Sequence, residues 1–348
     1  MPIKILLVTP TQGGIGGIEQ FYSTVASFLR SDKRFYIKLL VKVVSNYELS
    51  GALSSVLNRV GAETYFYRHP SGIPTNLLRW SDIVYTQNPI PEVCLFAKLF
   101  GKKLAITHHN WLQKPNSLQG IRWRLSSAAA DFRWYNSNFV RNTWEKTPPN
   151  ENSESFPTIS NVPMKMSQFE GRKGFTFISR WIPNKGVEIL LEAYQTSNVD
   201  RSLWPLTMMG SGPLLDKLTK SCQNDPINGL TITGFVSEEE KFQRIGASRW
   251  HITPPCTFED MGLTPLEARS VGVPCIVSDD GGVPEVCGPG AIVVRRGDVD
   301  SLRDAIEKVT EMSSGTYEGI SKQTFFALQR ELRTGEFYRQ AFLNLYNS

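Results

Sequence analysis

The chain has 348 residues, 41% of them hydrophobic and 20% charged, which is typical of a globular protein, and no apolar run reaches the roughly 20 residues that span a bilayer. Its length suits two domains of roughly 150 to 180 residues each. The five cysteines lack CxxC spacing and the four histidines lack metal-ligand spacing, which argues against a disulfide framework or a structural zinc site and favours a reducing cytoplasm.

The charge is divided unevenly along the chain. Residues 1–165 contain 19 Lys and Arg against 10 Asp and Glu, a balance of +9, whereas residues 166–348 contain 19 against 23, a balance of −4. Such asymmetry suggests different partners for the two halves. The basic half could face an anionic membrane or a phosphate-bearing acceptor, or it could be an ordinary solvated surface. Nucleic acid is not expected as a partner, because there is no basic helix or aromatic RNA-binding motif.

Short apolar runs alternate with longer amphipathic stretches in the first half, a pattern typical of a parallel α/β sheet. The expected strands are 3–9, 36–44, 63–67, 82–86, 103–107 and 132–136, with helices between them, most clearly 17–30. The first apolar run is broken by Pro10 and is therefore expected to be a buried strand rather than a signal peptide. The segment 151–171 is polar and turn-rich, which predicts a linker.

The same alternation restarts after this segment. Strands are expected at 175–179, 206–209, 230–233, 251–253, 275–278 and 292–294, and helices near 185–197, 236–247, 264–271 and 299–312. Residues 337–346 have the pattern of one more amphipathic helix. Two α/β units of similar size are therefore predicted, and sheets of this kind bind ligands at the carboxyl ends of their strands.

Two features of the first half lie at such strand ends. The run Gly13-Gly14-Ile15-Gly16-Gly17 precedes the helix 17–30, where glycines would let an anion approach helix N–H groups, although the run could also be a plain turn. It matches neither the dinucleotide fingerprint nor the P-loop. His108 and His109 follow the strand 103–107, where a histidine can donate to a bound polar group or make a local structural hydrogen bond.

Two cations lie at the first strand end of the second half. Arg180 and Lys185 border the loop that follows the strand 175–179. A guanidinium supplies a fork of donors and an ammonium a point charge, a combination that suits a diphosphate. An ordinary surface loop would also accommodate them.

Two carboxylates border a predicted helix start further on. Thr264 is expected to cap this helix, with Pro265 in its first turn, so that backbone N–H groups near Gly262 would face an anion. Glu259 precedes the helix and Glu267 lies within it, among apolar residues. Carboxylates accept hydrogen bonds from ring hydroxyls, so this arrangement suits a sugar nucleotide better than two unrelated solvated glutamates.

Together these motifs resemble the retaining GT-B glycosyltransferases often called family 4, over nearly the whole chain. The most specific match is the E-x7-E signature, Glu259 to Glu267. The other matches are the R-x4-K pair Arg180 and Lys185, the GGxE loop Gly16 to Glu19, T-x-H at Thr107 to His109, S-x-F/Y-V at Ser137 to Val140, and the turn Gly281 to Glu285. The chain departs from the family at Met261, where Phe is usual, and at Pro254 to Thr257, where the usual Pro-Ser is replaced.

The resemblance implies roles for the matched residues. Arg180 and Lys185 would neutralise the leaving diphosphate, Glu267 would hold the nucleotide ribose, and Glu259 would contact the sugar. The implied catalytic residues are His109, Arg180, Lys185 and Glu259, with His109 binding the transferred sugar or stabilising an oxocarbenium-like state. The implied donor-binding residues are Gly16, Gly17, Arg180, Lys185, Glu259, Met261, Gly262, Leu263, Thr264 and Glu267. No metal or other cofactor is expected.

The predicted fold is therefore GT-B, with two Rossmann-like domains facing across a cleft. Residues 1–165 would bind the acceptor, residues 166–330 the nucleotide sugar, and residues 331–348 would form a helix crossing back to the first domain. The expected activity is transfer of a hexose (mannose, glucose or N-acetylhexosamine) with retention to a glycan, a lipid-linked or a small-molecule acceptor, as in polysaccharide biosynthesis. A sugar-nucleotide epimerase and an inactive sugar-nucleotide-binding module are the alternatives.

The segment 119–125, Gln-Gly-Ile-Arg-Trp-Arg-Leu, bears on where the protein acts. With the +9 balance of the first half, it suggests contact with anionic lipid at the inner face of the membrane, or binding of a lipid-linked acceptor. An ordinary solvated helix is the alternative interpretation.

Overall fold

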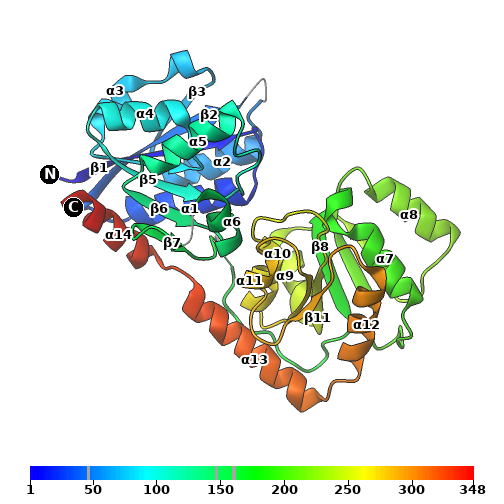
Figure 1. The fold of residues 1–348 in the computed structure, drawn as a ribbon. Helices are drawn as coiled ribbons and strands as arrows, with labels where there is room; N and C mark the ends of the chain where they lie inside the picture. The colour runs from blue at the N-terminus through cyan, green and yellow to red at the C-terminus, as the bar shows by residue number, and fades with distance from the viewer. Residues whose placement is uncertain (45–47, 146–147, 159–161) are drawn as a thin grey trace. The chain divides into compact units, whose positions relative to one another are not determined.

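The computed structural model describes residues 1–44, 48–145, 148–158 and 162–348, and the chain divides into two compact units. Unit 1 comprises Met1–Asn161 with Leu332–Ser348, and unit 2 comprises Val162–Glu331. Each unit contains one parallel sheet with helices on both faces (Figure 1). Part of the predicted linker, residues 159–161, lies outside the described residues.

The sheet of unit 1 has seven strands in the order β3-β2-β1-β4-β5-β6-β7, all parallel. The strands are β1 Ile3–Thr11, β2 Phe35–Val43, β3 Glu63–Tyr67, β4 Ile83–Gln87, β5 Lys103–His108, β6 Phe132–Tyr135 and β7 Ser153–Ser155. The helices are α1 Gly17–Arg30, α2 Gly51–Val60, α3 Thr75–Trp80, α4 Pro91–Leu99, α5 Leu118–Ala128, α6 Asn138–Trp144 and α14 Gly335–Asn347, with a 3₁₀ turn at Pro70–Gly72. The short strand β7 lies inside the segment expected to be linker, because three polar residues carry no apolar strand signal.

The sheet of unit 2 has six parallel strands in the order β10-β9-β8-β11-β12-β13. The strands are β8 Phe175–Arg180, β9 Leu206–Ser211, β10 Leu230–Gly234, β11 Trp250–Thr253, β12 Cys275–Ser278 and β13 Ile292–Val294. The helices are α7 Val187–Thr196, α8 Leu215–Asn224, α9 Glu238–Ala247, α10 Leu263–Ser270, α11 Val283–Val286, α12 Val299–Thr310 and α13 Ser314–Glu331, with a 3₁₀ turn at Pro183–Lys185. The prediction that Thr264 caps α10 is wrong. The helix begins at Leu263, so Gly262 is its N-cap and Thr264 lies in its first turn.

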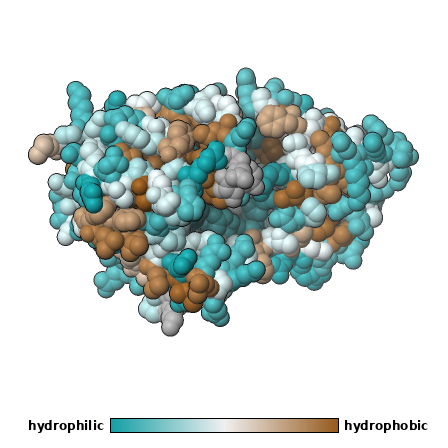
Figure 2. All heavy atoms as spheres, turned by 90° about the horizontal axis from the view of Figure 1, so that it is seen from above, coloured by the Kyte–Doolittle hydropathy of each residue, from teal (hydrophilic) through white to brown (hydrophobic). Residues whose placement is uncertain are grey.

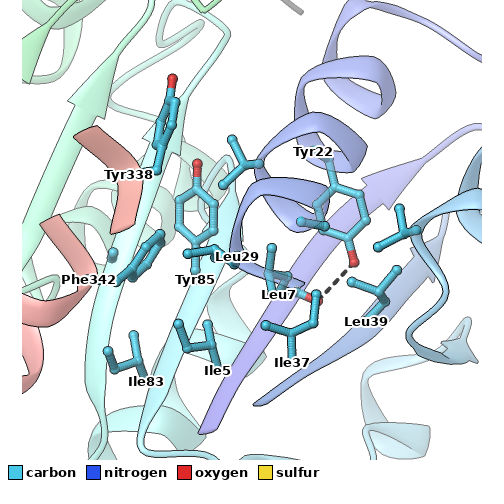
Figure 3. Packing of buried hydrophobic residues seen from close by; sticks show 14 of the residues in the cluster. Ile5, Leu7, Tyr22, Leu29, Ile37, Leu39, Ile83, Tyr85, Tyr338 and Phe342 are labelled. Carbon is cyan, nitrogen blue, oxygen red and sulfur yellow. Dashed lines mark hydrogen bonds between the residues drawn. The ribbon is translucent and has the colours of Figure 1, made fainter. Parts of the chain in front are cut away.

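Alternate residues of the unit 1 strands feed two separate cores, as expected for a sheet covered on both faces. Ile5 and Leu7 of β1 pack with α1, α2 and α14, whereas Leu6 and Val8 pack with α3 and α4. Figure 3 shows the first core, in which the Tyr22 hydroxyl donates to the Leu7 carbonyl at 3.0 Å. This satisfies the one polar atom that the tyrosine carries into an apolar environment.

The C-terminal helix α14 is an integral part of unit 1. Its side chains Tyr338, Phe342 and Leu345 are buried in the same core as β1 and α1. The Phe342 ring lies 5.1 Å from that of Tyr85 in edge-to-face geometry, as Figure 3 shows. The amphipathic pattern of residues 337–346 thus corresponds to a helix packed on the N-terminal sheet.

Candidate nucleotide-sugar site

The candidate residues of unit 2 lie on loops at the carboxyl edge of its sheet. Arg180 ends β8, the segment 254–262 follows β11, and the turn 279–282 follows β12. All six strands are parallel, so their carboxyl ends meet at one edge, the position where such sheets bind ligands.

Close backbone packing holds the first two loops together. Gly186 has φ +72°, and a Cβ there would approach the Pro254 carbonyl to 1.9 Å, so only glycine fits. The Cys256 N–H donates to the Asn184 carbonyl at 3.0 Å. This contact brings Lys185 to Glu259, and their side chains form an ion pair that is mostly shielded from solvent.

The segment after β11 is fixed in turn to the turn after β12. The Glu259 N–H donates to Oδ1 of Asp280 at 2.6 Å, and the Gly282 N–H donates to the Glu259 carbonyl at 2.9 Å. Gly281 has φ +53°, and a Cβ there would lie 2.0 Å from the Glu259 carbonyl oxygen. Glu259 is therefore held at the backbone from both sides.

Asp280, which directly precedes the family-matched turn Gly281 to Glu285, is fully buried. Burial raises the pKa of the Asp280 carboxyl, and the Glu259 N–H and the Arg296 guanidinium oppose that rise. Arg296 lies 3.5 Å from Asp280 and its guanidinium sits 5.0 Å from the centre of the Phe258 ring. Neither Asp280 nor Arg296 was identified from the sequence, and the only signal was an aspartate next to a Gly-Gly turn.

Glu267 has a partner that the sequence did not reveal. Lys241 of α9 lies 2.8 Å from Oε1 of Glu267 and also contacts Glu238. Burial raises the pKa of the Glu267 carboxyl, and Lys241 partly offsets this. Burial opposes the charge of Lys241, but Glu267 and Glu238 outweigh it and raise the lysine pKa. The site therefore contains two carboxylates, each paired with its own lysine.

The remaining predicted residues of unit 2 differ in their exposure and contacts. Arg180 is exposed, and among the described residues its guanidinium takes part in no ion pair. Met261 is 4% exposed and lies at the approach to α10. Thr264 Oγ1 lies 3.0 Å from Thr253 Oγ1, so it ties the helix start to β11. Leu263 is the first residue of α10 and half-buried.

In unit 1, the glycine-rich loop is fixed by Glu19. The Gly16 N–H donates to Oε2 of Glu19 at 2.9 Å, and the Thr11 hydroxyl donates to Oε1 at 2.9 Å. Glu19 thus forms a capping box at the N-terminus of α1, which begins at Gly17. The glutamate of the GGxE motif has a local structural role here, and Gly16 and Gly17 keep their backbone exposed or half-exposed.

The two adjacent histidines of unit 1 are both buried. Nε2 of His109 lies 2.7 Å from Oε1 of Gln87, and its ring meets Phe21 edge-on at 5.3 Å. His108 contacts Ser127 at 2.9 Å and stacks on Tyr135 at 4.4 Å. Burial lowers the pKa of both rings to about 3, so both are neutral at physiological pH. His108 has a structural environment, whereas His109 lies at the end of β5 with 6% of its surface exposed.

Acid should destabilise the protein through these histidines. The unfolded chain takes up a proton on each near pH 6.5, while the folded chain does not until about pH 3, so stability falls as pH drops through that window. Each histidine contributes about 1.4 kcal/mol per pH unit. In urea titrations, His109→Gln should reduce the slope of unfolding free energy against pH by about half that amount at pH 6.5 and by nearly all of it at pH 5. The exposed His69 provides the control, and an unchanged slope in His109→Gln would contradict the neutral assignment.

Known proteins resemble this chain in sequence. The family model "Glycosyl transferases group 1" matches residues 163–324, which cover nearly all of unit 2. The chain is 32% identical to O-antigen chain mannosyltransferase B of Escherichia coli over 36% of its length. It is 25% identical to a GDP-mannose-dependent monoacylated alpha-(1-6)-phosphatidylinositol monomannoside mannosyltransferase of Corynebacterium glutamicum over 59% of its length. The alignments span 34% and 60% of these relatives' own lengths.

Solved structures share the whole fold. Anabaena Alr3699/HepE in complex with UDP superposes with a TM-score of 0.80 at 15% identity, covering 99% of this chain and 100% of that one. A glycosyltransferase from Rickettsia africae superposes with a TM-score of 0.78 at 18% identity, covering 99% and 98%. The predicted GT-B fold of two Rossmann-like parallel-sheet domains is confirmed. The matches together support a GT-B glycosyltransferase.

Two further observations concern metal and membrane. Among the described residues, no group of three or more His, Cys, Asp or Glu side chains is placed to hold a metal ion. None of the helices in the described parts of the chain is both long and apolar enough to cross a membrane.

Proposed function

We propose that the protein transfers a hexose from a nucleoside-diphosphate sugar with retention at the anomeric carbon, and that no metal is essential. The observation that carries this proposal is the Lys185–Glu259 pair, which lies on the loop that Arg180 begins, at the carboxyl edge of a sheet within the matched group 1 region. A diphosphate gains charge as it leaves the sugar, and fixed cations at that place lower the barrier. The exposed Arg180 would bind the diphosphate first.

Donor binding would rearrange one ion pair. Lys185 is neutralised by Glu259 when no donor is present, so an incoming diphosphate would compete for the ammonium. The carboxylate released in this way could accept hydrogen bonds from the sugar hydroxyls. The start of α10 at Gly262 to Thr264 would supply backbone N–H groups to the same anion. The leaving phosphate would then act as base for the acceptor hydroxyl.

The nucleoside would lie on the other side of the site. Glu267 has one oxygen bonded to Lys241, and its other oxygen would accept the ribose hydroxyls. Phe235 follows β10 at the same edge of the sheet and is 82% exposed. An exposed ring at that place offers a stacking surface for a base. Unit 1 would receive a glycan, lipid-linked or small-molecule acceptor.

A donor screen tests the proposal. Relatives that are named as GDP-mannose-dependent make GDP-mannose the first donor, and UDP-glucose and an ADP-sugar follow. A bound donor should raise the melting temperature by an amount that grows with its affinity. The same donor should then glycosylate one member of an acceptor panel, with the anomeric configuration of the product read by NMR.

The outcomes separate the alternatives. A new sugar nucleotide formed without acceptor would identify an epimerase. Donor binding without turnover across the panel would identify an inactive binding module. An inverted product would contradict the retaining assignment, and no stabilisation by any nucleoside-diphosphate sugar would contradict the donor site itself.

A further inference from the structure

Helix α5 of unit 1 exposes its apolar side. Leu118, Ile121 and Leu125 are 75%, 45% and 66% exposed, and their spacing places them along one stripe of the helix. The side turned toward the protein instead carries Gly120, Ser126 and Ser127, which are buried. This is the reverse of the usual surface helix, whose apolar stripe faces the core.

The small residues on the inner side let the helix sit close to its neighbours. A Cβ at Gly120 would lie 2.4 Å from the Lys114 carbonyl oxygen and 2.9 Å from that of Pro115. Residue 120 must therefore remain glycine for the segment before α5 to pack under it. The apolar stripe cannot turn inward without breaking this contact.

Helix α4 extends the apolar area. It packs beside α5 on the same face of the sheet (Figure 1), and its Leu95 and Leu99 are 58% and 66% exposed. These two leucines and the three apolar residues of α5 form what we call the α4–α5 surface. On the face that Figure 2 displays, hydrophobic residues gather in patches among hydrophilic ones. Contiguous exposed apolar patches mark interaction sites.

Charge identifies the kind of partner. Residues 91–128 contain six Lys and Arg but a single acid, Glu92. That acid is already paired with Lys42 at 2.5 Å. Arg122 and Arg124 are exposed on either side of the apolar stripe, and neither takes part in an ion pair with a described residue. The surface therefore combines apolar side chains with unneutralised positive charge.

A cavity of about 440 Å³ adjoins one edge of this surface. Its lining includes Leu118 and Trp123 of α5 and the Lys42–Glu92 pair, and it is mostly apolar. An apolar group bound on the α4–α5 surface could therefore also enter this cavity.

We propose that the α4–α5 surface docks on an anionic lipid bilayer, with its leucines in the interface and Arg122 and Arg124 at the headgroups. Apolar side chains with flanking arginines are the composition of helices that lie in the membrane interface. Each arginine near an anionic surface contributes about a fivefold gain in partition. The proposal concerns unit 1 alone and does not rest on the assigned donor chemistry.

Co-sedimentation with vesicles tests this. The 348-residue chain should bind vesicles of phosphatidylcholine and phosphatidylglycerol at 7:3, and should bind pure phosphatidylcholine at least tenfold more weakly. Arg122→Gln with Arg124→Gln should lower binding to the anionic vesicles about 30-fold. Leu118→Ser with Leu125→Ser should lower it at least tenfold. Binding should also weaken between 0.05 and 0.5 M salt.

Matched variants in unit 2 provide controls. Lys217 and Lys322 are exposed cations, and Leu203 and Phe326 are exposed apolar residues, so Lys217→Gln with Lys322→Gln and Leu203→Ser with Phe326→Ser should bind as the parent does. Unchanged melting temperatures would show that every variant is folded. Equal loss in the controls, absence of binding by the parent, or equal binding to neutral vesicles would overturn the proposal. So would a dimer in solution that the Leu118→Ser and Leu125→Ser pair dissociates, because the partner would then be a second copy.

Discussion

Replacing Lys185 by alanine is expected to weaken binding of a nucleoside diphosphate at least tenfold and to lower kcat/KM for the donor by a factor of about 10² to 10³. Lys185 is already oriented by Glu259 and lies on a turn whose geometry Gly186 fixes. Little reorganisation is therefore needed when the diphosphate replaces the carboxylate. Because charge on the leaving group grows in the transition state, kcat should fall as well as affinity.

Calorimetry with ligands of different charge isolates the effect. The diphosphate should lose affinity in Lys185→Ala, whereas the corresponding nucleoside, which has no phosphate, should bind as it does to the parent. Lys217→Ala is the matched control, since Lys217 is an exposed lysine of the same unit paired with Glu188. Arg180→Ala should resemble Lys185→Ala. Full turnover in both variants, or equal losses for nucleoside and diphosphate, would contradict the assignment of the diphosphate site.

Most strands were predictable from the sequence because they are buried on both faces. In β1 and β12, for example, nearly every residue is buried, so an uninterrupted apolar run marks the strand. Helix α8 was missed because its apolar stripe is narrow: only Leu218 is buried, and Leu215 and Cys222 are partly buried beside it. Helix α13 was missed because its buried side includes polar residues, Ser321 and Thr324, which interrupt the apolar pattern.

The positions of the candidate residues at the sheet edge could be predicted from the sequence, but the ion pairs and hydrogen bonds between them could not. Glycines and acids at strand ends are visible in a sequence, since topology alone places them at one edge of the sheet. The Lys241–Glu267 contact joins two helices, and nothing local in either helix indicates the other. Asp280 reaches Glu259 across a backbone contact that depends on the conformation of Gly281. Both pairings follow from tertiary packing, which a single sequence does not specify.

Lys241→Met is expected to destabilise unit 2 by about 3 to 5 kcal/mol, because it leaves the Glu267 carboxylate buried without a cation. The side chains of Lys241 and Glu267 are only 7% and 17% exposed. Glu267→Gln should cost less, since Lys241 keeps Glu238, whose side chain is 70% exposed. Urea unfolding of Lys241→Met, of Glu267→Leu and of the double variant Lys241→Met with Glu267→Leu would complete a double-mutant cycle. The double variant should be more stable than Lys241→Met alone.

The pH dependence of Lys241→Met gives an independent check. Burial already raises the pKa of Glu267, and loss of Lys241 should raise it further. A carboxyl whose folded pKa exceeds its unfolded value favours folding at low pH, and this contribution is lost as pH rises through the folded pKa. The gap in stability between parent and variant should therefore narrow as pH falls from 7 towards 5, a comparison in which the histidine contributions cancel.

Lys322→Met serves as the control for this experiment, because Lys322 pairs with Glu318 on the surface at 3.8 Å and should contribute nothing measurable. Glu267→Gln should also weaken nucleoside binding if this carboxylate holds the ribose, without affecting the binding of inorganic diphosphate. If the difference in unfolding free energy between the parent and Lys241→Met does not depend on pH, Glu267 stays ionised without Lys241. The lysine would then contribute packing alone. In that case Lys241→Met should leave nucleoside affinity unchanged, whereas an electrostatic partner of the ribose-binding carboxylate should alter it.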